Sequence, residues 1–185
     1  MPSARSAVPL IAVAFSLGAA LARAQPGDRG ATTGAPADPM RALLDAHNRV
    51  RARHCAPPLR WSADLARVAQ RWADTLVARG CAFEHSGGRY GENLAAGTEG
   101  ALGPDDVVQM WYRESRSYRF SNGQFSMATG HFTQLVWIAT RAIGCGKRTC
   151  NAMGLWVCNY DPPGNVEGEY AANVRPASCR RSVRP

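Results

Sequence analysis

The sequence predicts an α+β domain, and three observations lead to this class. Apolar residues recur at helical spacing in three segments between residues 40 and 114. Two strand-length runs rich in β-branched and aromatic residues follow, at His131–Trp137 and Leu155–Tyr160. Six cysteines add covalent links between such elements if the protein is exported. We therefore expect helices packed on a sheet that disulfides staple together.

Residues 1–24 have the features of a cleaved secretory signal peptide. Arg5 precedes a short apolar run, Ala7–Phe15, and Ala22-Arg23-Ala24 supplies a small-x-small cleavage site. The run is too short to span a bilayer, and an uncleaved membrane anchor is the alternative interpretation. No later segment is long and apolar enough to cross a membrane. The protein is thus expected to be secreted, extracellular or periplasmic, and not transmembrane after signal cleavage.

The segment 25–38 is predicted to be a flexible linker. It is rich in glycine and proline and has no large apolar residue, so it cannot offset the entropy cost of ordering. The folded domain then spans 39–179, a length that suits one domain with a core of its own, and a basic tail follows at 180–185.

The chain is basic, with a formal net charge of +8 that falls to +6 if Arg5 and Arg23 leave with the signal. Such a charge would attract the protein to an anionic cell-surface component. The alternative is a bias towards arginine with solvated charges, since Lys147 is the single lysine. No basic run is interleaved with aromatic residues, so we expect no nucleic-acid partner.

The first predicted helix begins with Asp38 as N-cap and Pro39 in the first turn. We interpret His47, on the apolar face of this helix, as a hydrogen-bonded core histidine rather than a catalytic one. His54, at the helix end, is interpreted as a surface or capping residue. The apolar face comprises Met40, Leu43, Leu44, His47 and Val50.

A second helix is predicted between Ser62 as its N-cap and Gly80 as the glycine that ends it. Its buried face comprises Leu65, Val68, Ala69, Trp72, Leu76 and Val77.

A third helix is predicted to begin at 103–106. Two aspartates lie in its first turn, where the helix dipole stabilises negative charge. Glu114 places a carboxylate on the apolar face of this helix, and that position requires a partner. The face comprises Val107, Val108, Trp111 and Glu114.

The two strand-length runs are expected to pair as an antiparallel hairpin. The segment between them, Ile143–Cys150, contains glycines that would let the chain reverse. In this interpretation His131 lies at the start of the first strand.

Several chemistries are excluded by the motifs that the sequence lacks. It has no HExxH, GxSxG, P-loop, GxGxxG or CxxC pattern. Six cysteines in an exported chain predict three disulfides, for which 15 connectivities are open. A zinc clip built on Cys145 and Cys150 is an alternative that an oxidising compartment disfavours.

Six motifs resemble those of the CAP superfamily, which includes cysteine-rich secretory proteins, venom antigen 5 and the pathogenesis-related 1 proteins. The resemblance to this SCP/TAPS domain covers roughly 41–174. It implies an α-β-α sandwich in which helices cover both faces of a central, mainly antiparallel sheet. The motifs are GHFTQLVW (130–137), WVCNYDPPGNVEGEY (156–170), HNxxR (47–51), FxHS (83–86), GENL (91–94) and WYxE (111–114).

The family pattern also implies a disulfide framework. It suggests one bridge between Cys145 and Cys158 and another between Cys81 and Cys150, and the third would then join Cys55 to Cys179. The chain departs from the plant members, which carry a further cysteine pair just before the GHFTQLVW motif, where 121–129 has none.

Matched motif by motif, the resemblance implies a cleft tetrad of two histidines and two glutamates. Spacing alone cannot bring these residues together, because they lie on four separate segments. Neutral imidazoles are ligands for a divalent cation, with zinc favoured over calcium, and the glutamates would orient them or act as bases. Alternatively, the tetrad is a polar network without a metal. The implied metal ligands are His85 and His131, and the complete tetrad is His85, Glu92, Glu114 and His131.

The resemblance implies a secreted CAP-domain binding protein with a cation-binding cleft, and with lipid or sterol as a further ligand, as for some relatives. A metal-dependent hydrolase is one alternative. Because no protease signature is present, a protein that is not an enzyme is favoured and no catalytic residue is assigned. A purely structural or interaction module of the cell surface is the other alternative.

Overall fold

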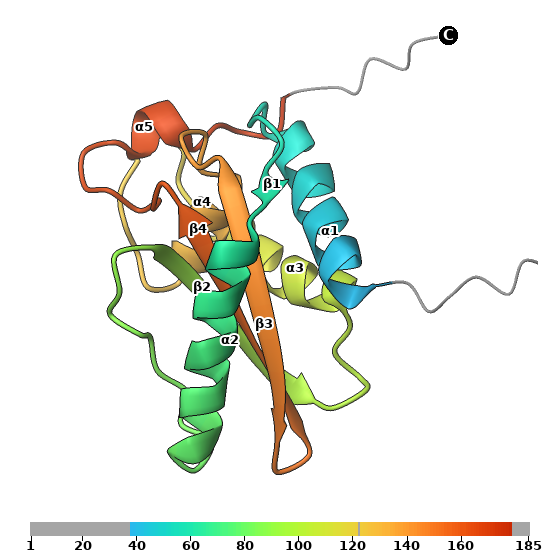
Figure 1. The fold of residues 1–185 in the computed structure, drawn as a ribbon. Coiled ribbons are helices and arrows are strands. Elements are labelled where there is room, and N and C mark those ends of the chain that lie inside the picture. The colour runs from blue at the N-terminus through green and yellow to red at the C-terminus, as the bar shows by residue number, and fades with distance from the viewer. Residues whose placement is uncertain (1–37, 122, 179–185) are drawn as a thin grey trace, which may run out of the picture. The chain divides into compact units, whose positions relative to one another are not determined.

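The computed structural model describes residues 38–121 and 123–178. The predicted signal peptide, most of the predicted linker and the basic tail lie outside the described residues. The elements, in chain order (Figure 1), are α1 (Pro39–Arg53), β1 (Arg60–Trp61), α2 (Ala63–Ala78), β2 (Gly91–Thr98), α3 (Pro104–Arg113), the 3-10 turn η1 (Glu114–Arg116), α4 (Gly130–Val136), β3 (Ala142–Cys150), β4 (Met153–Asp161) and α5 (Tyr170–Asn173).

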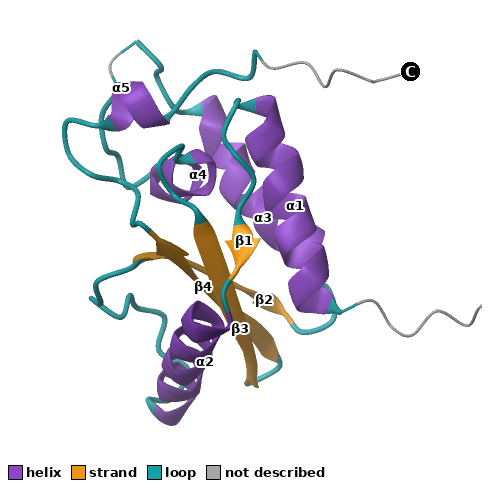
Figure 2. Ribbon diagram, turned by 45° about the horizontal axis from the view of Figure 1, so that its top comes forward, coloured by secondary structure: helices purple, strands orange, loops and turns teal. Residues whose placement is uncertain are grey.

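The sheet has four strands in the order β1-β3-β4-β2. The pairs β3–β4 and β4–β2 are antiparallel, whereas β1 pairs with β3 in parallel, so the sheet is mixed and mainly antiparallel. Helix α2 covers one face of the sheet, and α1, α3 and α4 lie on the other (Figure 2). This arrangement confirms the α-β-α sandwich. In the described part of the chain no helix has both the length and the apolar character of a membrane span.

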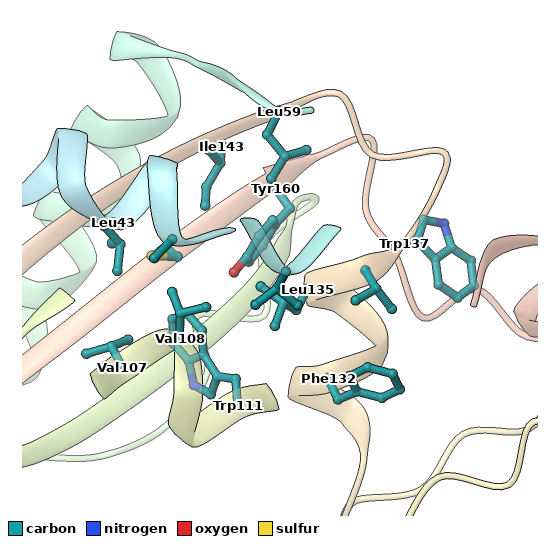
Figure 3. Close-up of a cluster of buried hydrophobic side chains, with 14 of the residues drawn as sticks. Leu43, Leu59, Val107, Val108, Trp111, Phe132, Leu135, Trp137, Ile143 and Tyr160 are labelled. Carbon is teal, nitrogen blue, oxygen red and sulfur yellow. The ribbon is translucent and has the colours of Figure 1, made fainter. Parts of the chain in front are cut away.

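Side chains of β4 alternate between two buried layers, as expected for a strand covered on both faces. Leu155 and Val157 join the cluster under α2. Trp156, Cys158 and Tyr160 join the larger cluster with α1, α3 and α4. Figure 3 shows part of this second cluster, with Trp111 from α3 and Phe132 and Leu135 from α4.

The predicted helix ends are confirmed at α1 and α2. The Asp38 side chain accepts a hydrogen bond from the backbone N–H of Met40 at 2.9 Å. The Ser62 hydroxyl accepts one from Leu65 at 3.3 Å. Gly80 follows the last turn of α2 with φ +75°, a left-handed conformation that glycine adopts without strain.

The prediction of a strand at 131–137 is wrong, because Gly130–Val136 forms helix α4. β-Branched and aromatic composition is a weak guide where tertiary contacts decide the conformation. Here the Glu114 carboxylate accepts the first free backbone N–H groups of the helix. At the other end the buried Arg51 side chain donates to the carbonyls of Leu135 and Trp137. His131 is therefore the second residue of a helix and does not start a strand.

The predicted hairpin exists, but its first strand is β3 rather than 131–137. The glycines expected to reverse the chain lie inside this strand, directly under α2. A Cβ on Gly144 would lie 2.1 Å from the backbone nitrogen of Ala66, and one on Gly146 would lie 2.5 Å from Gln70 Cα. These glycines are needed for the close approach of α2 to the sheet.

Two disulfides join the pairs that the family resemblance implies. Cys145 and Cys158 face each other across β3 and β4, and Cys81 is joined to Cys150 at the far end of β3. Cys179 lies outside the described residues, so the pairing of Cys55 with Cys179 stays a prediction.

Candidate functional site

Glu114 and His131 form the first of two histidine–glutamate pairs. Glu114 follows the last turn of α3, and its carboxylate accepts from His131 Nδ1 at 2.6 Å. It also accepts from the backbone N–H groups of His131 and Phe132, at 2.9 and 3.0 Å. The His131 ring stacks on Trp111, with centroids 6.2 Å apart and planes inclined by 16°. The ring is thus fixed by both its edge and its face.

His85 and Glu92 form the second pair. Glu92 Oε1 accepts from His85 Nδ1 at 2.8 Å and from the backbone N–H of Ser86 at 2.9 Å. The Glu92 side chain is nearly buried at 6% exposure, whereas the His85 side chain is 58% exposed. The second carboxylate oxygen, Oε2, is buried without a hydrogen-bond partner in the described part of the chain.

In both pairs the carboxylate fixes the tautomer of its histidine. Because a carboxylate accepts hydrogen bonds, the ring proton lies on Nδ1, and the lone pair of a neutral ring lies on Nε2. Within residues 38–121 and 123–178, Nε2 of His85 and Nε2 of His131 have no hydrogen-bond partner. Metal-binding histidines characteristically have this arrangement, with one nitrogen bonded to a carboxylate and the other available to the metal.

Both histidines line one cavity of about 280 Å³. Glu92 and Asn93 of β2 lie in its wall, together with Asn165. Glu114 does not line this cavity but contributes to a second one of about 260 Å³, which His131 also reaches. Three members of the implied tetrad, His85, Glu92 and His131, thus line one cavity. The fourth, Glu114, does not line it but is hydrogen-bonded to His131.

The electrostatics of the second pair favour its charged form. The hydrogen bond to Glu92 raises the pKa of His85, although partial burial opposes this. Burial alone would raise the pKa of Glu92, but the hydrogen bonds from His85 and Ser86 outweigh it and lower that pKa. A cation that binds Nε2 of His85 therefore competes with protonation of that ring, and Glu92 stabilises the protonated ring.

The donor set is small for a metal site. Among the described residues, no group of three or more His, Cys, Asp or Glu side chains is arranged to hold a metal ion. The cavity is lined by His85, His131 and Glu92, and Glu92 Oε2 is buried without a hydrogen-bond partner in the described part of the chain. Such a set fits a cation that keeps bound water and does not fit a closed structural zinc site, which needs four protein ligands.

The other two histidines lie outside this cavity. His47 is a buried core residue, as predicted: its Nδ1 donates to the Leu43 carbonyl at 2.7 Å and its Nε2 accepts from the Tyr160 hydroxyl at 2.9 Å. His54 is the C-cap of α1, as one of the two predicted alternatives has it, and it is not at the surface, because only 2% of the residue is exposed. It is buried against Tyr112 and Phe132, and its Nδ1 donates to the Arg175 carbonyl at 2.6 Å.

Two polar residues that position His131 were missed in the sequence. Asn93, from β2, donates through Nδ2 to the His131 carbonyl at 3.1 Å. Asn165, which follows β4, donates to the Gly130 carbonyl at 2.9 Å. Each lies inside a motif that carries the family resemblance, and Asn93 is a buried polar residue next to Glu92. That position could have marked it as part of a hydrogen-bond network.

Comparison with protein families gives a match to the "Cysteine-rich secretory protein family" (CAP) over residues 44–160. Among curated proteins, Protein PRY2 of Saccharomyces cerevisiae is 45% identical over 139 residues, and Secreted protein RBT4 of Candida albicans is 45% identical over 151 residues. The aligned regions cover 72% and 77% of this chain but 40% of each relative. The aligned regions therefore span about two fifths of the length of these two yeast proteins.

A plant relative is matched over more of its own length. Pathogenesis-related protein 1C of Nicotiana tabacum is 43% identical over 129 residues, which cover 68% of this chain and 76% of the relative.

Solved structures share the fold at lower identity. The hookworm platelet inhibitor superposes with a TM-score of 0.63 at 20% identity, covering 78% of this chain and 80% of that chain. The structure of NaASP2 with Zn²⁺ superposes with a TM-score of 0.57 at 22% identity, covering 79% and 93%.

Proposed function

The chain belongs to the cysteine-rich secretory protein (CAP) family, and on this premise we propose that it is an exported binding protein whose two-histidine cleft takes up a divalent cation. His85 and His131 would be the protein ligands, and Glu92 and Glu114 would orient them. Imidazole nitrogens favour zinc or copper over calcium, which prefers oxygen ligands. When bound, the cation would supply a positive charge and exchangeable water positions in the cleft.

The observation that carries this proposal is the matched pairing of the two histidines. Each ring donates its Nδ1 proton to a glutamate, at 2.8 Å for His85 and 2.6 Å for His131. Both rings line the same cavity. Among the described residues neither Nε2 atom has a hydrogen-bond partner, so both are available to a cation. NaASP2, a protein of the same fold, has been crystallised with Zn²⁺.

Two nitrogen ligands define the expected strength of binding. Structural zinc sites use four protein ligands and contribute to folding directly. With two imidazoles and water, the affinity should be moderate, and the protein should fold without the cation. The hydrophobic clusters and the two disulfides on either side of the sheet support folding without it.

Export is the second part of the proposal. Disulfides such as Cys81–Cys150 persist in oxidising compartments. The relative RBT4 is named a secreted protein. We propose that residues 1–24 are removed as a signal peptide, that 25–38 is a linker and that 39–179 is the CAP domain. Intact-mass measurement of the exported protein tests this, because retention of Met1 on a membrane-bound form would contradict it.

Calorimetric titration with zinc chloride near neutral pH tests the cation site. His85→Ala and His131→Ala should each remove most of the binding, since either change leaves one imidazole. His47→Gln is the matched control, because that histidine is buried outside the cleft. Wild-type affinity in the His85→Ala and His131→Ala double variant would show that the tetrad is a structural network.

A lipid or sterol is a second candidate ligand, and one feature favours it. The loop before α4 exposes three large apolar side chains, with residue exposures of 37% for Phe120, 47% for Phe125 and 85% for Met127. Such a group of apolar side chains on a surface is typical of contact with a membrane or an apolar ligand. Mass spectrometry of lipids extracted from the purified protein tests this. No lipid in the wild type, or equal lipid in a Phe125→Ser variant, would contradict it.

A further inference from the structure

Strand β2 is an edge strand of the sheet, because β4 is its only strand neighbour among the described residues. Its register with β4 runs without a bulge over eight consecutive pairs, from Gly91 to Thr98. The sequence GENLAAGT contains no lysine, arginine or proline, the residues that usually blunt an edge strand. By contrast, the opposite edge, β1, is only two residues long.

The hairpin fixes which backbone groups of β2 point outward. Asn151 and Ala152 form a two-residue turn with positive φ, so Cys150 and Met153 are a hydrogen-bonded pair. Hydrogen-bonded pairs alternate along an antiparallel ladder. The register of β4 with β2 carries this alternation into β2. The backbone N–H and C=O groups of Asn93 and Ala95 therefore point towards β4. The N–H and C=O groups of Glu92, Leu94 and Ala96 point away from β4.

An independent contact confirms this direction. The Leu94 carbonyl accepts a hydrogen bond from Trp111 Nε1 at 2.9 Å, on the side away from β4. In the described part of the chain, no hydrogen bond occupies the N–H of Leu94 or the N–H and C=O of Ala96. Leu94 is only 4% exposed. A backbone donor at such a position needs a partner.

Two cavities follow one another along this edge. Glu92 and Asn93 line the proposed cation cleft, whereas Leu94, Ala95 and Ala96 line the second cavity of about 260 Å³. The other apolar side chains of the second cavity are Phe83, Met110 and Trp111. Phe83 and Met110 are exposed, at 56% and 37%, so the apolar cavity lies at the surface beside the free backbone groups.

We propose that the outer edge of β2 binds an extended peptide as an added strand, with one apolar side chain in the cavity beside Phe83, Met110 and Trp111. Among the described residues, the N–H of Leu94 and the N–H and C=O of Ala96 are free, and they recognise a peptide main chain, which offers both donors and acceptors at strand spacing. An acyl chain could fill the cavity but would leave these groups unpaired. The proposal does not depend on the cation.

The first experiment selects linear peptides from a random displayed library on the oxidised, full-length chain in the presence of a chelator. An Ala96→Pro protein serves for counter-selection. Because the Ala96 N–H points away from β4, proline removes the outward donor and leaves the ladder with β4 intact. Selected peptides should carry an apolar residue and bind the wild type about tenfold more tightly than Ala96→Pro.

Hydrogen exchange then locates the bound peptide. It should slow exchange at the Leu94 and Ala96 amides and leave Asn93 and Ala95 unchanged, because these already bond to β4. A Met110→Glu variant should lose binding through the cavity, whereas Met153→Glu, at 40% exposure on the hairpin, is the matched control. If Ala96→Pro fails to fold, the comparison of Met110→Glu with Met153→Glu still tests whether the peptide binds at the cavity.

Two outcomes would overturn the proposal. In one, no selected peptide distinguishes the wild type from Ala96→Pro or Met110→Glu. In the other, exchange at Leu94 and Ala96 slows as the protein concentration rises without any peptide, which would show that a second copy of the chain covers the edge.

Discussion

Glu114 and His131 are joined by two hydrogen bonds, one to the ring Nδ1 at 2.6 Å and one to the backbone N–H at 2.9 Å. A single carboxylate therefore fixes the tautomer of the histidine and also caps the helix that carries it. The carboxylate comes from the end of α3, so the position of His131 depends on the packing of α3 against α4.

Loss of the Glu114 carboxylate should destabilise the protein even without any ligand. Glu114→Ala leaves the backbone N–H groups of His131 and Phe132 without their acceptor, and we expect the free energy of unfolding to fall by about 2 kcal/mol. Denaturant unfolding measures this. Glu167→Ala, at an exposed site, is the control and should change stability little. Equal stability of the two variants would contradict the capping role.

Zinc affinity should fall as the pH falls, and the fall should begin at a pH above the ordinary pKa of histidine. The hydrogen bond to Glu92 raises the pKa of His85, and a protonated ring cannot bind a cation. Glu92→Gln removes that carboxylate, so the pKa of His85 should fall and zinc binding should persist to lower pH. Calorimetry across a pH series on both proteins tests this, and an unchanged pH midpoint would rule out Glu92 as the group that sets the proton competition.

Stability in acid should depend on His47. Burial lowers the pKa of this residue from 6.5 to about 4, so the unfolded state takes up a proton before the folded state does. The contribution of neutral His47 to the free energy of unfolding is fully present above about pH 6.5 and is lost as the pH falls towards 4. A pKa shift of this size corresponds to about 3 kcal/mol. Urea unfolding at a series of pH values should show this loss, with a shallower slope in His47→Gln. The same slope in both proteins would exclude His47 as the source.

We expect no hydrolysis of peptides or esters above background, with or without zinc. The Glu114 carboxylate already accepts three hydrogen bonds, which suits an orienting residue better than a base. Glu92 Oε2 is buried and unpartnered among the described residues, so it is the oxygen that the hydrolase alternative would use. A hydrolytic rate that disappears in Glu92→Gln, while that variant retains zinc binding, would favour the alternative.

The helices of the first half could be predicted because their signals are local. Asp38, Ser62 and Gly80 lie at the ends of α1 and α2, where capping chemistry places such residues. Strand β2 gave no such signal, since its alanines and glycines have low strand propensity and its pairing with β4 spans a long stretch of chain.

Helix α4 could not be predicted from its own residues. Its sequence has the composition of a strand, and its ends are held by Glu114 and Arg51, which lie far away in the chain. The cleft presents the same difficulty. His85 and His131 lie on different elements, so their meeting in one cavity followed from the family resemblance and not from their spacing.

The most direct test of the cation site is long-range ¹H–¹⁵N NMR of the histidine rings during zinc titration. We expect zinc to shift the Nε2 resonances of His85 and His131 while Nδ1 of each ring stays protonated, and to leave the rings of His47 and His54 unchanged. A titration that leaves His85 and His131 unshifted at saturating zinc, or that shifts their Nδ1 atoms instead, would contradict it.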